Sequence, residues 1–367
     1  MRSVHIGMWS FDTVSNQNLG TRLRLTMLES ELLKFERFCL DIENTLETEA
    51  RDISRKRKIL GIFIAPENLF CHALDSPEPR AHDYGDKRQL SERERDIILH
   101  HLRKMSRAYP RMLLIPGSIS WKKSIERPTG SDRKWWHQVA SPNPFAALAD
   151  PVPSRREKSL ARLLKNAKLL GIKGDEAVSA PLGFINENTP ARTVEQKVTS
   201  LEDATHIAKN TSYVLLGGIV QLKYNKASDF HEVLDNSSTV FIPGVLLARL
   251  ECDGLSLALD LCLDNNYATL QAKGPAVDIH ILMSAATEGE DTHANLKEGG
   301  WFVHCSSNRM YCGLKQKGFG SLASESIHKL GDLRCSSILI LESAQEVEQV
   351  RALMQQLELQ KYMNIWD

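Results

Sequence analysis

One cysteine of this sequence stands where a nucleophile would be expected. Cys262 follows the apolar segment GLSLALDL, whose alternating leucines predict a largely buried strand, and the polar residues Asp264 and Asn265 come next in a predicted turn. A cysteine at such a junction can be accessible while its backbone stays rigid. A lone cysteine there is more often a small apolar residue that closes a core strand. The prediction therefore depends on other segments of the chain.

A carboxylate and an ammonium group also follow predicted strands. The run Ile59–Ile64 predicts a buried strand, and Glu67 comes shortly after it. Lys226 lies just beyond the second strand of a hairpin that Gly217-Gly218 predicts. Each has a simpler explanation when taken alone, because Glu67 could cap a helix and Lys223 lies in the same region as Lys226.

The elements that must position these residues alternate between strands and helices, which predicts an α/β protein. Ser91 and Glu94 form the S-x-x-E pattern that begins a helix, which we expect to extend to about Ala108. The other predicted elements are strands at Ser3–Trp9, Met112–Ile115, Tyr213–Leu216 and Ile219–Leu222, later strands in PAVDIHILMSAA, GGWFVHCSSN and SSILILES, and helices at 29–46 and 344–359.

Residues 121–205 differ in character from the rest. This stretch contains Trp135-Trp136, a proline-rich patch and a basic helical segment near 155–170, with no confident core strand. We interpret it as an insertion, a lid or a partner surface, within a single domain that spans 1–367. A long ordered loop with one packed helix is an equally good interpretation.

Composition excludes several classes of function. Lys+Arg and Asp+Glu both total 46, so no global charge favours nucleic acid or an anionic membrane as a partner. No signal peptide or membrane-spanning run is predicted. The seven cysteines are scattered without a CxxC pair, which favours reduced thiols in the cytoplasm over zinc or disulfides. Cys305, Cys312 and His304 lack a fourth metal ligand, and GFGSLA lacks the βαβ context of a dinucleotide site, so we predict no metal and no cofactor.

Three motifs follow one another along the chain: APE ending at Glu67, YNK ending at Lys226 and CLD starting at Cys262. Their order resembles that of the nitrilase, or carbon–nitrogen hydrolase, superfamily. Supporting segments are the hairpin NTSYVLLGG, FIPG at 241–244, VDIHILMSAA and GFGSLA. The resemblance covers most of 3–120 and 206–355. It implies a nitrilase-like four-layer α-β-β-α sandwich with a large insertion, and a homodimer.

The chain also departs from the family pattern. Leu263 replaces the usual aromatic residue after the cysteine, and Asn225 replaces a basic residue before the lysine. Where family members often carry a second glutamate the chain has Ser237 and Ser238, and the nearest carboxylate is Glu232. Glu232, Asp264 and Asn265 are therefore the candidate substrate-binding residues.

The resemblance implies a separate chemical role for each of the three residues. Cys262 is the predicted nucleophile, Glu67 the general base and acid, and Lys226 the group that stabilises developing negative charge. The leading prediction is hydrolysis of a non-peptide C–N bond in a small molecule, with an amide favoured over a nitrile, through a thioester. The alternatives are an amine acyltransferase that uses the same three residues, and a catalytically degenerate binding protein.

Overall fold

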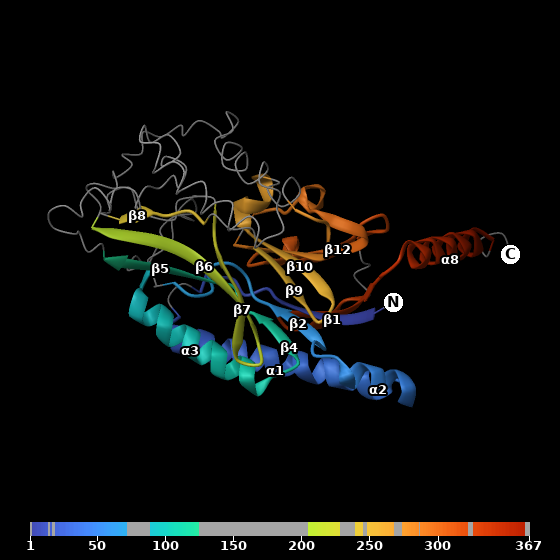
Figure 1. Ribbon diagram of the computed structural model, residues 1–367, viewed down its shortest axis with the longest axis horizontal. Coiled ribbons are helices and arrows are strands. Elements are labelled where there is room, and N and C mark those ends of the chain that lie inside the picture. Colours follow the sequence, from blue (N-terminus) through green and yellow to red (C-terminus); the bar gives the residue numbers. More distant parts are fainter. Residues whose placement is uncertain are drawn as a thin grey trace, which may run out of the picture.

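The computed structural model of the chain contains two β-sheets that pack face to face (Figure 1). Helices cover the outer face of the first sheet. The structure describes residues 2–13, 15–16, 19–71, 89–124, 205–227, 239–244, 248–267, 274–285, 287–321 and 326–363.

The first sheet has ten strands. Strands β1, β2 and β4 are parallel, so their carboxyl ends lie at one edge. Strand β6 runs antiparallel to β4, and β7 returns antiparallel to β6, so β7 also ends at that edge. The order is β15 (His328–Leu330), β16 (Leu333–Ile340), β1 (Arg2–Trp9), β2 (Gly61–Ile64), β4 (Met112–Ile115), β6 (His206–Leu216), β5 (Ser118–Ser124) and β3 (Leu90–Ser91), with β7 (Ile219–Asn225) and β8 (Thr239–Phe241) also paired to β6.

The second sheet has six strands, of which the central three, β10, β11 and β12, are parallel. Its order is β14 (Gly320–Ser321), β13 (Gly313–Gln316), β12 (Leu296–Ser306), β11 (Val277–Ser284), β10 (Leu255–Leu261) and β9 (Ala248–Cys252). All seven residues of β10 are buried, as the alternating leucines predict. The leucines face the first sheet, and Ala258 faces away from it.

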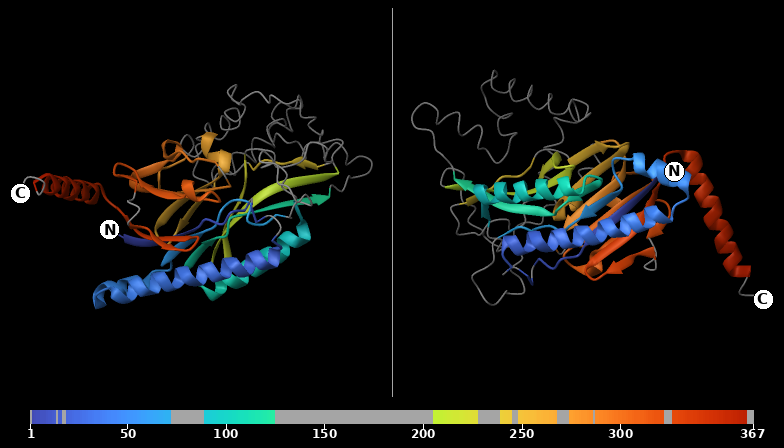
Figure 2. Two further views of the ribbon diagram at one scale, coloured as in Figure 1. Left: turned by 180° about the vertical axis from the view of Figure 1, so that it is seen from behind. Right: turned by 90° about the horizontal axis from the view of Figure 1, so that it is seen from below.

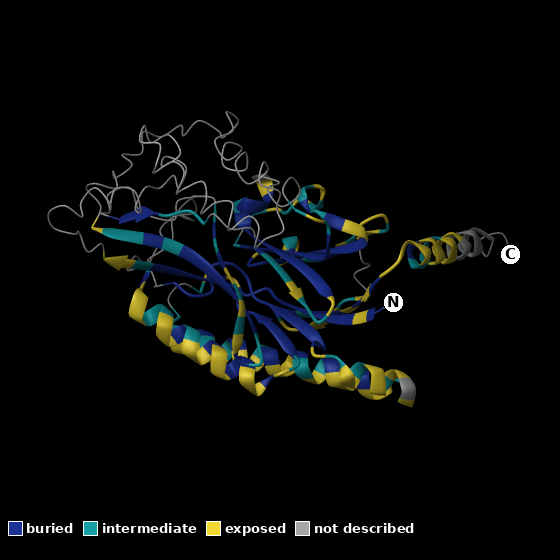
Figure 3. Ribbon diagram, viewed as in Figure 1, coloured by how far each residue is buried: buried dark blue, intermediate teal, exposed yellow. Residues whose placement is uncertain are grey.

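The main core lies between the sheets and joins side chains of β1, β2 and β4 to those of β10, β11 and β12. Helices α1 (Thr21–Thr45) and α3 (Glu92–Ala108) cover the outer face of the first sheet over a second apolar cluster. Figure 3 shows these helices buried on one side and exposed on the other. Helix α2 (Thr48–Lys56) follows α1, and helix α8 (Ala344–Met363) extends away from the sheets (Figure 2).

The outer face of the second sheet is covered differently. Ala294, which follows the 3₁₀ segment η5 (Asp291–His293), packs with Ala258, Leu282 and Phe302 on this face. Within the described ranges, the α1/α3 layer and the two sheets supply three layers of the expected sandwich, and short segments such as η5 contact the remaining face.

Several local predictions are confirmed together with the α/β class. Ser91 and Glu94 form the predicted capping box, and α3 ends at Ala108. Gly217 and Gly218 connect β6 to β7, and the turn within GFGSLA connects β13 to β14. None of the helices in the described part of the chain combines the length and apolarity needed to cross a bilayer.

A strand extends into the start of the expected insertion, 121–205, where no core strand was predicted. Strand β5 continues through Ser124, and its pairing with β6 includes the register pairs Trp121 with Lys209 and Lys123 with Ile207. Trp121 is buried, and its indole N–H donates to Thr211 Oγ1 at 2.8 Å. The sequence did not predict this strand, because the two lysines near the end of β5 interrupt the apolar pattern. Residues 125–204, including Trp135-Trp136, lie outside the described ranges.

Candidate active site

The predicted glutamate and lysine form a direct ion pair in the interior. Lys226 Nζ donates to Glu67 Oε1 at 2.8 Å, and neither side chain has any exposed surface. Glu67 follows β2 and Lys226 follows β7, whose carboxyl ends share one edge of the first sheet. Glu67 Oε2 is buried and has no hydrogen-bond partner among the described residues. One carboxylate oxygen is therefore held by the protein, and the other can accept a proton.

Asn210 on β6 connects both members of this pair. Its side-chain Nδ2 donates to Glu67 Oε1 at 3.0 Å and to Asn68 Oδ1 at 3.2 Å. Its main-chain carbonyl accepts from the Lys226 amide at 2.8 Å. Asn210 is fully buried, so one residue fixes the carboxylate and the backbone that carries the ammonium.

The turn that carries Glu67 is held by close main-chain packing. Asn68 has φ of 58°, in the left-handed region, and its amide donates to Ser118 Oγ at 2.9 Å. Gly117 has φ of 72°, and a Cβ atom there would lie 2.1 Å from Pro66 O, so only glycine fits. The buried Arg24 of α1 donates to Leu69 O at 2.7 Å. These contacts limit the movement of Glu67.

The FIPG segment holds the backbone around Lys226. The Gly244 amide donates to Lys226 O at 2.8 Å, and the Ile242 amide donates to Ala208 O at 2.9 Å. A Cβ atom at Gly244 would lie 1.9 Å from Asn225 O, which excludes any larger residue. The motif thus positions the lysine through main-chain contacts.

Cys262 begins the 3₁₀ segment η4 (Cys262–Tyr267) directly after β10. Its φ is 51°, a left-handed conformation that costs a non-glycine residue about 1–3 kcal/mol and that clusters at functional sites. Its side chain is 5% exposed, and its Sγ lies 2.7 Å from Thr287 Oγ1. The predicted strand-to-turn junction is confirmed, and the thiol contacts a hydroxyl group.

Asp264 joins the cysteine turn to the lysine segment. Its Oδ2 accepts from Tyr224 OH at 2.6 Å and from the Ala227 amide at 3.1 Å, so it binds residues on both sides of Lys226. Burial, and after it the Asp264 charge, raises the pKa of Tyr224 well above its ordinary value, which keeps the phenol protonated as a donor. Asp264 therefore has a structural role, and its contact with substrate stays a prediction.

The other two candidate substrate-binding residues have different outcomes. Asn265 is buried, and its Oδ1 accepts from the Glu290 amide at 3.0 Å. Its Nδ2 has no hydrogen-bond partner among the described residues, so an amide donor remains available beside the cysteine turn. Glu232 lies outside the described ranges, as do Ser237 and Ser238.

A second set of hydrogen bonds supports the cysteine from the end of β11. Ser284 Oγ donates to Thr287 O at 3.1 Å, and it lies 2.8 Å from His304 Nε2 on β12. Burial lowers the pKa of His304 to about 4, so this imidazole is neutral at pH 7. His304 is therefore engaged with Ser284, and no group of metal-ligating residues occurs in the part of the chain that is described.

Sequence reasoning missed Asn210 and Thr287. Asn210 lies within the NTSYVLLGG motif, but a single asparagine in a strand carries no signal for a buried carboxylate partner. Thr287 is in the stretch TEGED, where nothing distinguishes it from an ordinary loop residue.

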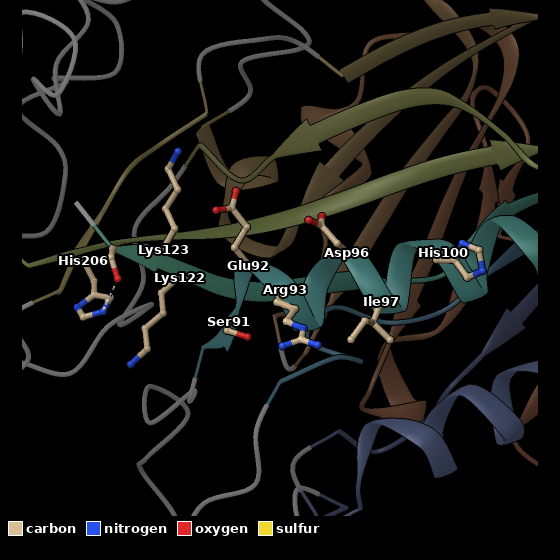
Figure 4. A pocket seen from close by; sticks show the side chains of 10 residues that line it. Ser91, Glu92, Arg93, Asp96, Ile97, His100, Lys122, Lys123 and His206 are labelled. Carbon is tan, nitrogen blue, oxygen red and sulfur yellow. Dashed lines mark hydrogen bonds between the residues drawn. The ribbon is translucent and has the colours of Figure 1, made fainter. Parts of the chain in front are cut away.

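The surface hollow in Figure 4 is separate from these residues. It has a volume of about 830 Å³ and lies where the start of α3 meets the end of β5. Ser124 and His206, which flank residues 125–204, are joined there by a hydrogen bond of 3.3 Å between Ser124 Oγ and His206 Nε2. None of the predicted site residues lines this hollow. The residues that line it are Ser91, Glu92, Arg93, Asp96, Ile97, His100, Lys122, Lys123, Ser124 and His206.

No family model and no curated protein matches the chain. Among solved structures, it is similar to a carbon–nitrogen hydrolase from Helicobacter pylori, with 12% identity, a TM-score of 0.42, and coverage of 97% of this chain and 94% of the other. It is also similar to Saccharomyces cerevisiae Nit3, a member of branch 10 of the nitrilase superfamily, with 12% identity, a TM-score of 0.40, and coverage of 96% of this chain and 94% of the other. A third similar structure is an amidase from Nesterenkonia sp., with 10% identity, a TM-score of 0.39, and coverage of 95% of each chain.

Proposed function

We propose that the protein hydrolyses a non-peptide C–N bond of a small molecule, an amide in preference to a nitrile, through a covalent thioester on Cys262. The observation that supports this most directly is the enclosed Glu67–Lys226 pair at 2.8 Å, with Glu67 Oε2 left without a partner among the described residues.

A buried ion pair is poor evidence for a purely structural role. Removing two charges from water costs several kcal/mol per ion, and the attraction between them often does no more than offset that cost. A well-packed apolar pair would serve stability as well. An ion pair kept at the carboxyl ends of β2 and β7, with one carboxylate oxygen left without a partner among the described residues, is better explained by chemistry.

The first chemical step would be attack on the substrate carbonyl carbon. Glu67 Oε2 accepts the Cys262 thiol proton while Sγ forms the new bond, and Glu67 Oε1 remains held by Lys226 and Asn210. The Lys226 ammonium stabilises the oxyanion that develops, in a site where water is excluded. Asn265 Nδ2 is a candidate donor to the same substrate.

Glu67 then acts as an acid. It gives its proton to the leaving nitrogen, the C–N bond breaks, and ammonia or an amine departs from the thioester. Glu67 next takes a proton from water, whose oxygen attacks the thioester carbon, and Cys262 is released as the thiol.

The test is turnover of a panel of small aliphatic amides and nitriles, measured as ammonia release, with Cys262→Ala as the matched control. We expect amides to be turned over by the natural chain and not by the variant. Intact-mass analysis of the stalled reaction should show an acyl adduct on Cys262. Failure of every substrate together with failure of Cys262 to accept any acyl group would contradict the proposal and favour a binding protein.

Added hydroxylamine separates hydrolysis from acyl transfer, since both begin with the same thioester. Hydrolysis predicts that the acid forms freely in water and that hydroxamate appears only as a competing product. A chain that forms product only when an amine is supplied is an acyltransferase. A homodimer and a cytoplasmic location stay predictions.

A further inference from the structure

Two cysteine side chains outside the candidate site lie against each other. Cys305 is on β12, and Cys312 immediately precedes β13. These strands are antiparallel, and His304 pairs with Gly313, so one further step along each strand brings Cys305 opposite Cys312. Residues directly opposite in antiparallel strands have Cα atoms about 4.5–5.5 Å apart, which lies within the range that a disulfide spans.

The contacts of the two thiols agree with this register. The two thiols are close enough for each to shift the pKa of the other. The Ser306 amide donates to Cys312 Sγ at 3.2 Å, so Cys312 lies against the residue that follows Cys305. Cys305 Sγ also lies 3.5 Å from the carbonyl oxygens of Trp9 and Ile64.

Their surroundings give the two cysteines different reactivities. The interaction with Cys305 lowers the pKa of Cys312, and the Ser306 amide and the charges of Arg334 and Arg309 lower it as well. Burial acts in the opposite direction. Burial raises the pKa of Cys305 well above its ordinary value. Cys312 is 6% exposed, whereas Cys305 has no exposed surface. Cys312 is thus the thiol that ionises and meets a small oxidant first.

We propose that Cys305 and Cys312 form a peroxide-sensitive dithiol that closes to an intramolecular disulfide. The Cys312 thiolate attacks one oxygen of a hydroperoxide, the O–O bond breaks, and the sulfenic acid forms as alkoxide or hydroxide leaves and takes up a proton. The Cys305 sulfur then displaces the sulfenic oxygen as water and loses its proton. The two thiols are oxidised by two electrons, and the peroxide is reduced to an alcohol, or water, and water.

A second pair of neighbouring cysteines provides a matched comparison. Cys39 and Cys335 are both fully buried and close enough for their charges to interact. Burial raises the pKa of Cys39 well above its ordinary value and that of Cys335 to about 12. Neither sulfur has the lowered pKa of Cys312, so this pair should stay reduced under the same treatment.

Trypsin makes the test direct, because Arg309 lies between the two cysteines. Cleavage after Lys297, Arg309 and Lys315 places Cys305 in EGGWFVHCSSNR, 298–309, and Cys312 in MYCGLK, 310–315. The full-length Cys262→Ala variant, which removes the competing candidate nucleophile, is treated with hydrogen peroxide, blocked with iodoacetamide and digested without reductant. We expect the two peptides to appear as one linked species that dithiothreitol separates, while the Cys39 and Cys335 peptides are carbamidomethylated after unfolding.

Variants of each cysteine test the order of the steps. In Cys305→Ser the sulfenic acid at Cys312 should persist and react with dimedone, whereas in Cys312→Ser no adduct should form at Cys305. No linked 298–309/310–315 species in the folded Cys262→Ala chain would overturn the proposal, whatever the serine variants do. Linkage of Cys39 to Cys335 at the same rate would overturn it as well, because oxidation would then not depend on the surroundings of Cys312.

Discussion

The two halves of the candidate site are built on different principles. Glu67 and Lys226 are enclosed between strands and held by main-chain contacts from Asn210, Gly117 and Gly244. Cys262 instead stands at the start of a 3₁₀ segment in a left-handed conformation, and its Sγ contacts the hydroxyl of Thr287. The predicted acid–base pair is part of the core, whereas the predicted nucleophile belongs to a turn that the core supports.

This difference separates two kinds of mutational effect. A change in the enclosed ion pair leaves a charge without its partner inside the protein, and should therefore lower both stability and turnover. A change at Cys262 removes the sulfur that we propose as the nucleophile and buries no new charge. The halves can thus be distinguished by measuring the free energy of unfolding and the rate of turnover on the same variants.

The largest effect on turnover is expected for Cys262→Ala. The variant should have no measurable amidase activity, yet its free energy of unfolding should change by no more than about 1 kcal/mol, because alanine is smaller and makes no new polar demand. Urea unfolding and ammonia release measure the two quantities. Cys252→Ala, at a half-buried cysteine on β9, is the control and should keep activity. Residual turnover by Cys262→Ala would remove the cysteine from the mechanism.

The largest effect on stability is expected for Lys226→Met. It leaves the Glu67 carboxylate buried without its cation, which should cost about 3–5 kcal/mol and abolish turnover. The double variant Glu67→Gln/Lys226→Met removes both charges and should recover most of the stability while staying inactive. Lys315→Met applies the same substitution to an exposed pair with Asp291 at 2.9 Å, and should cost less than about 1 kcal/mol. A Lys226→Met variant as stable as the natural chain would show that the pair is not enclosed in solution.

The same contrast explains what the sequence could predict. The strand before each of Glu67, Lys226 and Cys262 was visible as an apolar run, and the capping box at Ser91 marked the start of α3 because its chemistry is local. Helix α1 begins at Thr21, well before the predicted residue 29. The sequence does not reveal this start, because Gly20 provides no side-chain cap.

Contacts between distant segments were not visible. Asn210 and Glu67 lie 143 positions apart, and no local pattern tells a buried amide that holds a carboxylate from any other polar residue in a strand. Thr287 meets Cys262 only because β10 and β11 are parallel neighbours. Motifs therefore supplied the candidate catalytic residues, and the fold was needed to find the residues that contact and position them.

Asn210→Ala tests how the enclosed half is positioned. Loss of the donor to Glu67 Oε1 should lower the free energy of unfolding by up to about 3 kcal/mol, since a buried charged acceptor loses a hydrogen bond. Displacement of the carboxylate should lower kcat by roughly 10- to 100-fold while KM changes little. Steady-state kinetics on a turned-over amide separate the two. An effect on KM alone would mean that Asn210 contacts substrate instead of positioning Glu67.

Acid should weaken the region that supports the cysteine. Burial lowers the pKa of His304 from 6.5 to about 4, so between these values the unfolded chain binds a proton that the folded chain excludes. Stability is therefore retained above pH 6.5 and lost as the pH falls towards 4. The loss from this one group should be roughly 2 kcal/mol at pH 5.

Urea unfolding at pH 7 and pH 5 measures this loss. His5, whose pKa burial also lowers to about 4, should contribute a similar amount, so His304→Asn is expected to reduce the pH dependence without abolishing it. An unaltered pH dependence in His304→Asn would contradict the assignment.

The smallest effect concerns the contact between Thr287 and Cys262. Valine has nearly the shape of threonine, so Thr287→Val removes the hydroxyl that lies 2.7 Å from Sγ and leaves the packing in place. If the hydroxyl donates to the thiolate, its loss should slow alkylation of Cys262 by iodoacetamide about fivefold at pH 7, which corresponds to a hydrogen bond of about 1 kcal/mol. Thr292→Val, in the same loop, should leave the rate unchanged. Faster alkylation of Thr287→Val would mean that the hydroxyl shields the sulfur. Cys262 Sγ would then be shielded from solvent like the Glu67–Lys226 pair. The remaining difference between the two halves would be the left-handed backbone conformation of Cys262.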